Sequence, residues 1–309
     1  MLCNRITLTL LFLTLCLSSL AGTRRALVIG VGTYEDPEWM KINGDKDVKL
    51  VVDMLKLNIF HDIATLTQKE ATKSAIVKEF KALAERCAEG DTVYIHFSGH
   101  GQRMTDIDGD EEDGWDESWI PYDAYRKYCD KDHGEKHLCD DEIGVLLMNI
   151  RKKVGESGLI AVVVDACHAG DSTRKPDKSE GVVRGVYDNF LIPGKHRANK
   201  RKQMPEKWLT LCSCLDYQLN QEHPDGHGKL TLALHTLWPK MRGLDNETLV
   251  RTLDAYYQRS DVKGRYPQSP VLTGEMDKRR FSEIFRLQMR QRRSGWEGGG
   301  SEAPLHAMS

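Results

Sequence analysis

The chain lacks the features that mark several large classes of protein. Its formal net charge of −2 over 309 residues gives no general reason to expect binding to nucleic acid. No cysteines and histidines stand at the spacing of a zinc site, and no segment repeats along the chain. Charged residues make up 29% and hydrophobic residues 40%, which is ordinary for a globular protein. We therefore expect one large or two small folded domains that bind no nucleic acid.

A long apolar run is found only at the amino terminus. Arg5 precedes a Leu-rich core over residues 6–17, and Ser19 and Ala21 are small residues that suit a cleavage site. This pattern is typical of a secretory signal peptide, and the core is too short to span a membrane as a stable helix. An uncleaved anchor is the alternative. We expect a secreted or periplasmic protein with no membrane attachment once residues 1–21 are removed.

After this segment, short apolar runs alternate with amphipathic stretches. Alternating strands and helices predict an α/β fold with a mostly parallel, doubly wound sheet. A basic segment over residues 174–207 interrupts the pattern, and the Gly- and Ser-rich tail at 289–309 is expected to be disordered. We expect strands over 25–31, 63–66, 93–97, 159–164, 208–212 and 270–272, and helices over 45–60, 72–89, 141–153, 230–241 and 246–259.

Two of the expected strands end in residues that can do chemistry. The run at 162–164 is followed by Asp165, Ala166 and Cys167, and the run at 93–97 is followed by Ser98, Gly99, His100 and Gly101. Chemistry in open α/β sheets gathers at the carboxyl ends of neighbouring strands. A thiol and an imidazole placed there together are what a cysteine nucleophile and its acid/base partner require. The plainer interpretation of Cys167 is a buried core thiol.

These segments resemble the catalytic pair of the metacaspases, which are caspase-like cysteine peptidases. The resemblance implies a caspase-like sandwich, with a mostly parallel central sheet flanked by helices, in one domain over residues 22–288. It runs from about Arg25 to Phe281 and includes further blocks in the same order, namely Asp140–Ile143, Ser213 and Cys214 with Gln218 and Glu222, and Gln268–Pro270.

The resemblance also implies roles for the strand-end residues. Cys167 is expected to be the nucleophile and His100 the general acid and base. The backbone N–H groups of Gly101 and Cys167 are expected to stabilise the oxyanion. His168 stands beside the nucleophile and competes for the role of base, but the family pattern places it outside the catalytic pair.

Metacaspases cleave after Arg or Lys, and their acidic specificity pocket is matched here by Asp47 and Asp165, with Ser98 at its wall. A guanidinium requires carboxylate partners in a partly desolvated pocket. The pattern near Asp47 is one residue short, so Asp45 is the alternative, and a solvated residue in the first turn of a helix is the plainer interpretation. We expect protein or peptide substrates with Arg or Lys at the cleaved bond, and a monomeric enzyme.

The segment over residues 106–117 is strongly acidic, which suggests calcium. An EF-hand is disfavoured because its sixth position is Glu111 instead of glycine. The resemblance implies Ca²⁺ binding through Asp116, Asp140 and Asp141. The usual fourth ligand position holds Arg174, which leaves Asp171 as a substitute. A charged, solvated loop is the alternative to a calcium site.

Two further features of the chain invite a functional interpretation. A basic run contains candidate sites of self-cleavage for an enzyme that cuts after basic residues, or it is a solvated loop. Cys129 and Cys139 flank a polar segment, which suggests a disulfide in an oxidising compartment. Cys212 and Cys214 are expected on one face of a strand as buried small hydrophobes. The candidate residues for self-cleavage are Lys195, Arg197, Lys200, Arg201 and Lys202.

Two other functions compete with a metacaspase-like endopeptidase. A non-catalytic interaction module with a caspase fold would keep the sheet and lose the chemistry. A clostripain- or gingipain-like Arg peptidase would share the histidine and cysteine at the strand ends. Intact His100 and Cys167 disfavour the first alternative, and the Asp140–Ile143 block disfavours the second. No organic cofactor is expected.

Overall fold

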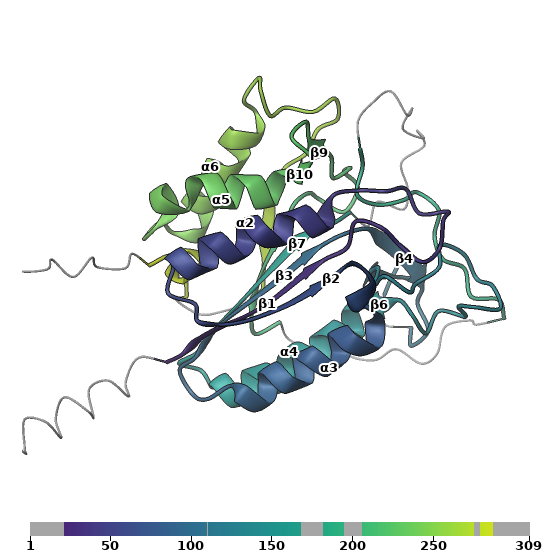
Figure 1. Cartoon of the computed structure of the whole chain (residues 1–309), viewed down its shortest axis with the longest axis horizontal. Coiled ribbons are helices and arrows are strands. Elements are labelled where there is room, and N and C mark those ends of the chain that lie inside the picture. The colour runs from purple at the N-terminus through teal and green to yellow at the C-terminus, as the bar shows by residue number, and fades with distance from the viewer. Residues whose placement is uncertain (1–21, 110, 168–181, 195–205, 275–278, 287–309) are drawn as a thin grey trace, which may run out of the picture.

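The computed structural model describes residues 22–109, 111–167, 182–194, 206–274 and 279–286. Six strands form a central sheet in the order β11-β8-β7-β3-β1-β2 (Figure 1). Neighbouring strands are parallel except for β11, which is antiparallel to β8. The strands are β1 (Arg24–Gly30), β2 (Asp62–Thr67), β3 (Thr92–Ser98), β7 (Leu159–Asp165), β8 (Leu209–Cys212) and β11 (Val271–Thr273).

Helices cover both faces of this sheet, which is why its inner strands β1, β3 and β7 are almost entirely buried. Successive side chains of a strand point to opposite faces, so Ala26 and Val28 of β1 join one core while Leu27 and Ile29 join the other. In Figure 1 the helices α3 (Lys73–Arg86) and α4 (Asp140–Val154) lie below the sheet, and α2 (Gly44–Leu57), α5 (Lys229–Met241) and α6 (Asn246–Tyr257) lie above it. The predicted caspase-like α/β architecture is confirmed.

The predicted elements of the main sheet and its helices are all present, with small differences at their ends. Thr72 caps α3 as expected, because its hydroxyl accepts a hydrogen bond from the backbone N–H of Ala75. Two short 3₁₀ turns, Gln68–Glu70 and Phe281–Ile284, complete the helical elements that the structure describes.

Two small sheets were not predicted. The first contains β4 (Gly101–Thr105), β5 (Trp115–Trp119) and β6 (Leu138–Cys139), and the second contains β9 (Glu222–His223) and β10 (His227–Gly228). The acidic segment over residues 106–117 is not a loop throughout, because its last residues belong to the strand β5. Glu117 is tolerated there because the guanidinium of Arg103 on β4 lies 3.2 Å from its carboxylate.

The predicted disulfide is not formed. Cys129 and Cys139 are both free thiols. Cys129 closes a turn with Asp132 through two backbone hydrogen bonds, whereas Cys139 caps α4, with its sulfur 3.7 Å from a carboxylate oxygen of Glu142. The two cysteines therefore have separate local partners.

The interpretation of Cys212 and Cys214 as one face of a strand is also wrong. The strand β8 ends at Cys212, which packs against the core on the side of α3 and α4. Cys214 lies beyond the end of the strand, in a separate cluster with Cys167. The chain turns between them, so strand periodicity does not apply.

Several predictions fall on residues outside the described part of the chain. These are the signal peptide over 1–21, His168, Asp171 and Arg174, the basic run over 195–202, and the tail over 289–309. Among the described residues, no helix combines the length and the apolar character needed to cross a membrane.

Candidate active site

The register of two parallel strands brings the candidate nucleophile and base to one edge of the sheet. Ser98 at the end of β3 pairs with Asp165 at the end of β7. His100 and Cys167 each follow two residues later. The N–H of Gly99 donates to the carbonyl of Asp165 at 3.4 Å, and this bond links the segments that follow the two strands. Both side chains are enclosed, with His100 fully buried and Cys167 1% exposed.

The imidazole of His100 is held in one orientation. Its ring stacks on Trp39 with a centroid distance of 5.1 Å, and Tyr34 lies 5.2 Å away on a tilted plane. Nε2 lies 2.7 Å from the carbonyl oxygen of Met40. A carbonyl oxygen only accepts, so Nε2 carries the hydrogen and donates it.

The other ring nitrogen of His100 is the atom available for chemistry. Nδ1 is buried and makes no hydrogen bond to any described residue. Burial lowers the pKa of His100 to about 4, although the bond to Met40 opposes this shift. At neutral pH the ring is therefore uncharged, and the lone pair on Nδ1 can accept a proton.

The thiol of Cys167 is turned toward the backbone. It donates to the carbonyl oxygen of Gln218 at 3.1 Å. Cys214 packs in the same cluster, together with Val183 and Leu219. A hydrogen bond to Cys167 and burial raise the pKa of the Cys214 thiol well above its usual value. Sequence reasoning interpreted Cys214 as a core residue and missed this contact, although its motif was among the segments that resemble the family.

The three residues predicted for the specificity pocket converge, and they converge on an arginine of the chain itself. One terminal nitrogen of Arg184, Nη1, lies 2.8 Å from the Asp47 carboxylate, 2.5 Å from the Ser98 hydroxyl and 3.7 Å from Oδ1 of Asp165. Nε and Nη2 donate to one carboxylate oxygen of Glu222 at 3.1 and 3.0 Å. Arg184 is fully buried, and so are Asp47, Ser98 and Asp165.

Charge and hydrogen bonds stabilise the ionised form of Asp47. Burial opposes ionisation, but the charge of Arg184 and the hydrogen bonds from His227, Ser98 and Arg184 hold the pKa of this carboxyl below its usual value. The alternative residue Asp45 is half-buried, with a carboxylate oxygen close to Gly32. The structure therefore places Asp47, and not Asp45, against the guanidinium.

Asp165 is fixed by donors from the other side of the pocket. Its Oδ1 accepts from the amide of Asn220 at 2.8 Å, and its Oδ2 accepts from the backbone N–H and the hydroxyl of Thr231 at 2.8 and 2.7 Å. Gly228 forms a wall, because a Cβ there would lie 2.1 Å from Asp165 Oδ2 and 2.5 Å from Arg184 Nη1. The pocket is a fitted cradle for a guanidinium. Glu222 and Gly228 belong to it although the sequence did not assign them there.

The carboxylates predicted for calcium lie in a second region. Asp116 is on β5, and Asp140 and Asp141 begin α4. Burial, followed by the charges of Asp140 and other carboxylates, raises the pKa of Asp116 to about 8. Burial and neighbouring acids also raise the pKa of Asp140 to about 8, but Asp140 is exposed and water screens it. Asp116 is only 5% exposed, so water does not screen its carboxylate from the neighbouring acids as it does for Asp140.

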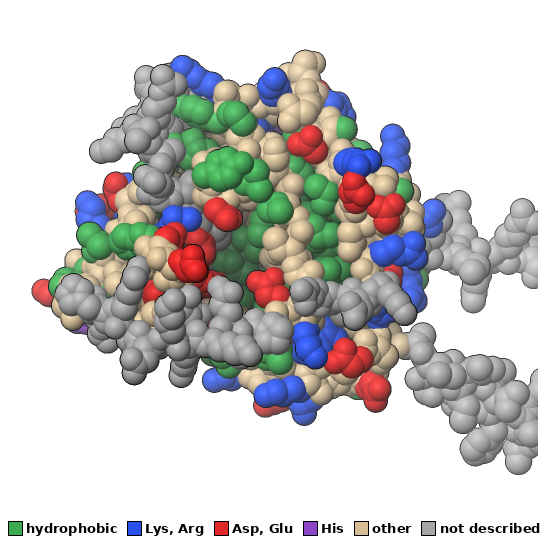
Figure 2. Space-filling view, turned by 180° about the vertical axis from the view of Figure 1, so that it is seen from behind, with side chains coloured by type: hydrophobic (Ala, Val, Ile, Leu, Met, Phe, Trp, Pro, Cys, Tyr) green, Lys and Arg blue, Asp and Glu red, His purple; other side chains and the backbone are tan. Residues whose placement is uncertain are grey.

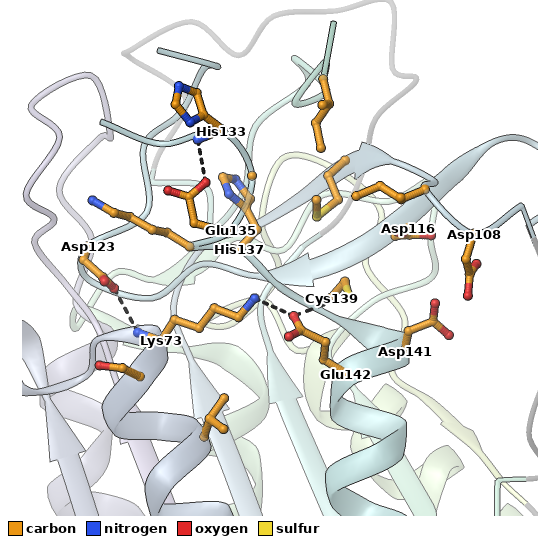
Figure 3. Close-up of a pocket in the computed structure, with 17 residues that line it drawn as sticks. Lys73, Asp108, Asp116, Asp123, His133, Glu135, His137, Cys139, Asp141 and Glu142 are labelled. Atoms are coloured by element: carbon orange, nitrogen blue, oxygen red, sulfur yellow. Dashed lines mark hydrogen bonds and ion pairs between the residues drawn. The ribbon is translucent and has the colours of Figure 1, made fainter. Parts of the chain in front are cut away.

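This acidic region adjoins a cavity of about 900 Å³. Figure 3 shows Asp108, Asp116 and Asp141 near one another at one side of it, and Figure 2 shows acidic side chains gathered beside a hollow in the surface. The oxygen ligands and their mutual repulsion fit a hard cation such as Ca²⁺. Within the described ranges, however, no three His, Cys, Asp or Glu side chains converge closely enough to hold a metal ion.

The fold and the strand-end pair define a caspase-like protein. Caspase-1 from Spodoptera frugiperda matches with a TM-score of 0.52 at 11% identity, covering 82% of this chain and 88% of that chain. Protein GSU0716 from Geobacter sulfurreducens matches with a TM-score of 0.59 at 21% identity, covering 81% and 92%. These similarities show the fold.

Sequence comparison identifies the family. The family model for the metacaspase peptidase C14 domain matches residues 24–176. Metacaspase-1B from Aspergillus terreus is 29% identical over 177 residues, which is 54% of this chain and 44% of that protein. Metacaspase-1B from Aspergillus oryzae is 28% identical over 304 residues, covering 83% and 68%. The chain spans less than half the length of the first of these relatives. Together, the family model and these relatives support a metacaspase, a cysteine peptidase of the C14 family.

Proposed function

We propose that this chain is an endopeptidase that cleaves peptide bonds after Arg or Lys. The observation that carries the proposal is the buried cradle of Asp47, Ser98, Asp165 and Glu222, which pairs with a guanidinium beside Cys167. Such a pocket selects a basic side chain because a buried carboxylate without a cation is strongly destabilised. It disfavours an acidic substrate for the same reason.

The chemistry follows from the two strand-end residues. Nδ1 of His100 takes the thiol proton, and the sulfur of Cys167 attacks the carbonyl carbon of the scissile bond. His100 then gives the proton to the leaving amine, and water hydrolyses the thioester. The backbone N–H groups of Gly101 and Cys167 are the proposed donors to the oxyanion.

Fluorogenic peptides ending in Arg, Lys or Asp test this function. Purified chain should hydrolyse the Arg and Lys peptides and leave the Asp peptide intact. The Cys167→Ala variant should be inactive on all three. Activity on no peptide under any reducing condition would favour the non-catalytic module, and preference for Asp would contradict the role of the pocket. A clostripain- or gingipain-like enzyme shares the preference for Arg, so only a difference in calcium response or in the catalytic residues would separate it.

Calcium is proposed as the activating ion, held by Asp116, Asp140 and Asp141. A divalent cation would neutralise the repulsion that raises the pKa of Asp116 and would tie β5 to the start of α4. Isothermal titration calorimetry should detect Ca²⁺ binding to the wild-type chain and none to Asp116→Asn. Equal binding by both chains would contradict this assignment.

Export and self-processing complete the proposal. Residues 1–21 are proposed to direct secretion or periplasmic transport, and an amino terminus at Gly22 in exported protein would support this. The chain is also proposed to cleave itself and to act as a monomer on protein or peptide substrates. The run over residues 195–202 is the self-cleavage site that the sequence alone suggests.

A further inference from the structure

The segment before Gly185 is bound in the manner of an extended peptide. Val183 forms an antiparallel bridge with Gln221. The N–H of Arg184 donates to the carbonyl of Asn220 at 2.9 Å, and the N–H of Glu222 donates to the carbonyl of Val182 at 2.8 Å. Addition of a strand to an exposed edge is a common way in which proteins bind peptides, because the backbone gives affinity and alternate side chains give specificity.

The side chains of this bound segment alternate as such a mode requires. Arg184 enters the acidic cradle, and Val183 packs into the cluster that contains Cys167 and Cys214. The basic side chain thus occupies the pocket in which a substrate residue preceding the cleaved bond would have to lie.

The residue after Arg184 lies against the nucleophile. A Cβ atom on Gly185 would be 2.5 Å from the carbonyl oxygen of Cys167 and 2.9 Å from its Cβ. Real Cβ atoms do not approach so closely, and only glycine fits. The peptide bond between Arg184 and Gly185 therefore passes directly beside Cys167.

From this arrangement we infer that Arg184–Gly185 is the bond that the chain cleaves first in itself, and that Arg184 blocks the specificity pocket until then. The inference rests on the proposed function and names one bond for it. This site differs from the basic run over residues 195–202. Arg184 is chosen because of its contacts with the pocket, whereas the basic run was chosen because many basic residues stand close together in it.

The reaction is an ordinary hydrolysis that uses the proposed residues. The thiol leaves the Gln218 carbonyl, passes its proton to His100 Nδ1, and forms a bond from sulfur to the carbonyl carbon of Arg184. The C–N bond to Gly185 breaks, and the same proton moves to the new amine of Gly185. Water then hydrolyses the thioester, which gives the Arg184 carboxylate and restores the thiol.

The charge of the pocket explains why cleavage would activate the enzyme. Asp47, Asp165 and Glu222 present three carboxylates to one guanidinium. When Arg184 leaves, the buried carboxylates lack their cation, and the basic side chain of a substrate restores it. Before cleavage, a substrate binds only to the fraction of molecules in which Arg184 has left, which reduces its apparent affinity.

Intact-mass analysis and amino-terminal sequencing of the purified full chain test the inference. Wild type should yield a fragment ending at Arg184 and another beginning at Gly185. Cys167→Ala and Arg184→Gln should give no such fragments, and Arg184→Lys should retain cleavage at the same position. The matched control replaces the five basic residues of the run 195–202 with Gln and should be cut like the wild type.

Kinetics provide a second readout that does not depend on Arg184→Gln folding well. Self-cleavage of the wild type should be first order, with a half-time unchanged by tenfold dilution. Hydrolysis of an Arg peptide should show a lag and then rise roughly tenfold or more as fragments accumulate. Wild-type enzyme should leave the Cys167→Ala chain uncut at the Arg184 bond, because that side chain is already buried in its own pocket.

The outcomes separate this inference from the proposed function. A first new terminus within the basic run, or a chain that hydrolyses Arg peptide while its Arg184–Gly185 bond stays intact, would overturn the inference and leave the peptidase function standing. Cleavage whose rate rises in proportion to concentration would also overturn it. Failure on both the peptide and the chain itself would reject the proposed function.

Discussion

Two regions of this protein gather carboxylates, and they differ in what balances the charge. Around Asp47 and Asp165, the guanidinium of Arg184 lies in the midst of the acids, and the pKa of Asp47 is low. Around Asp116, burial and neighbouring acids raise the pKa to about 8. The same type of side chain is thus fully ionised in one region and reluctant to ionise in the other. A cation supplied by the chain itself makes the difference.

The largest expected effect comes from a substitution in the region around Asp47 and Asp165, where Arg184 balances the carboxylates. Asp47→Asn breaks a fully buried ion pair with Arg184 and should lower the free energy of unfolding by about 3–5 kcal/mol, since the amide nitrogen of Asn cannot accept the hydrogen bonds that the carboxylate accepts from Arg184 and Ser98. It should also abolish hydrolysis of Arg peptides. Denaturation with urea measures the stability, and Asp45→Asn is the control because Asp45 lies nearby without contacting Arg184. Equal losses in the two variants would contradict the role given to Asp47.

The next largest effect should come from adding a cation to the region around Asp116, where no basic side chain balances the carboxylates among the described contacts of Asp116. Calcium at a hundred times its Kd should stabilise the wild type by about 2.7 kcal/mol. Asp116→Asn should lose this stabilisation, whereas Asp225→Asn, whose side chain is 71% exposed, should keep it. Calorimetric melting with calcium and with chelator makes the comparison. Calcium stabilisation that survives in Asp116→Asn would place the ion elsewhere.

A smaller effect should come from loosening Asp165 without changing its charge. Thr231→Val removes a hydroxyl that donates to Oδ2 at 2.7 Å and nearly preserves shape. A hydrogen bond to a charged group contributes about 1.5–3 kcal/mol to stability. We therefore expect the free energy of unfolding to fall by about 2 kcal/mol and the KM for Arg peptides to rise. Thr248→Val, near the start of α6, is the matched control for KM. An unchanged KM in Thr231→Val would show that the orientation of Asp165 does not depend on this donor.

The smallest effect separates the two regions by pH. In chelator, the folded protein holds a proton on Asp116 up to about pH 8, whereas the unfolded chain releases it near pH 3.8, the ordinary pKa of an aspartate. The folded state therefore binds more protons between these values, and stability should fall as pH rises from 5 to 8. Asp116→Asn should weaken that fall, which thermal melts at pH 5 and at pH 8 measure as a smaller drop in Tm than in the wild type. A steeper fall in the variant would contradict the raised pKa.

Much of the fold follows from the sequence because its signals are local. The apolar runs of β1, β3 and β7 and the amphipathic faces of α2 and α3 indicate a covered parallel sheet. The parallel register then brings His100 and Cys167 to one edge. The small β4-β5-β6 sheet was missed because charged residues such as Glu117 have low strand propensity, and the pairing of Glu117 with Arg103 on the neighbouring strand is not visible in the sequence.

The site was predictable where side-chain type carries the information. Asp47, Ser98 and Asp165 were assigned together from the family resemblance, and the structure brings them together. Arg184 was missed because the segment around it contains many basic residues and nothing local shows which one is buried. The carbonyl of Met40, which orients His100, leaves no trace in the sequence, since every residue carries a carbonyl.

The stacking of Trp39 on His100 has a consequence for observing the enzyme at work. The indole lies 5.1 Å from the imidazole, ring centre to ring centre, and is itself buried, with its N–H bonded to the carbonyl of Ala124. A protonated imidazole in contact with an indole quenches its fluorescence by electron transfer. The fluorescence of Trp39 therefore reports the charge on His100: it should dim when the proton arrives on the imidazole and brighten when the proton leaves during turnover.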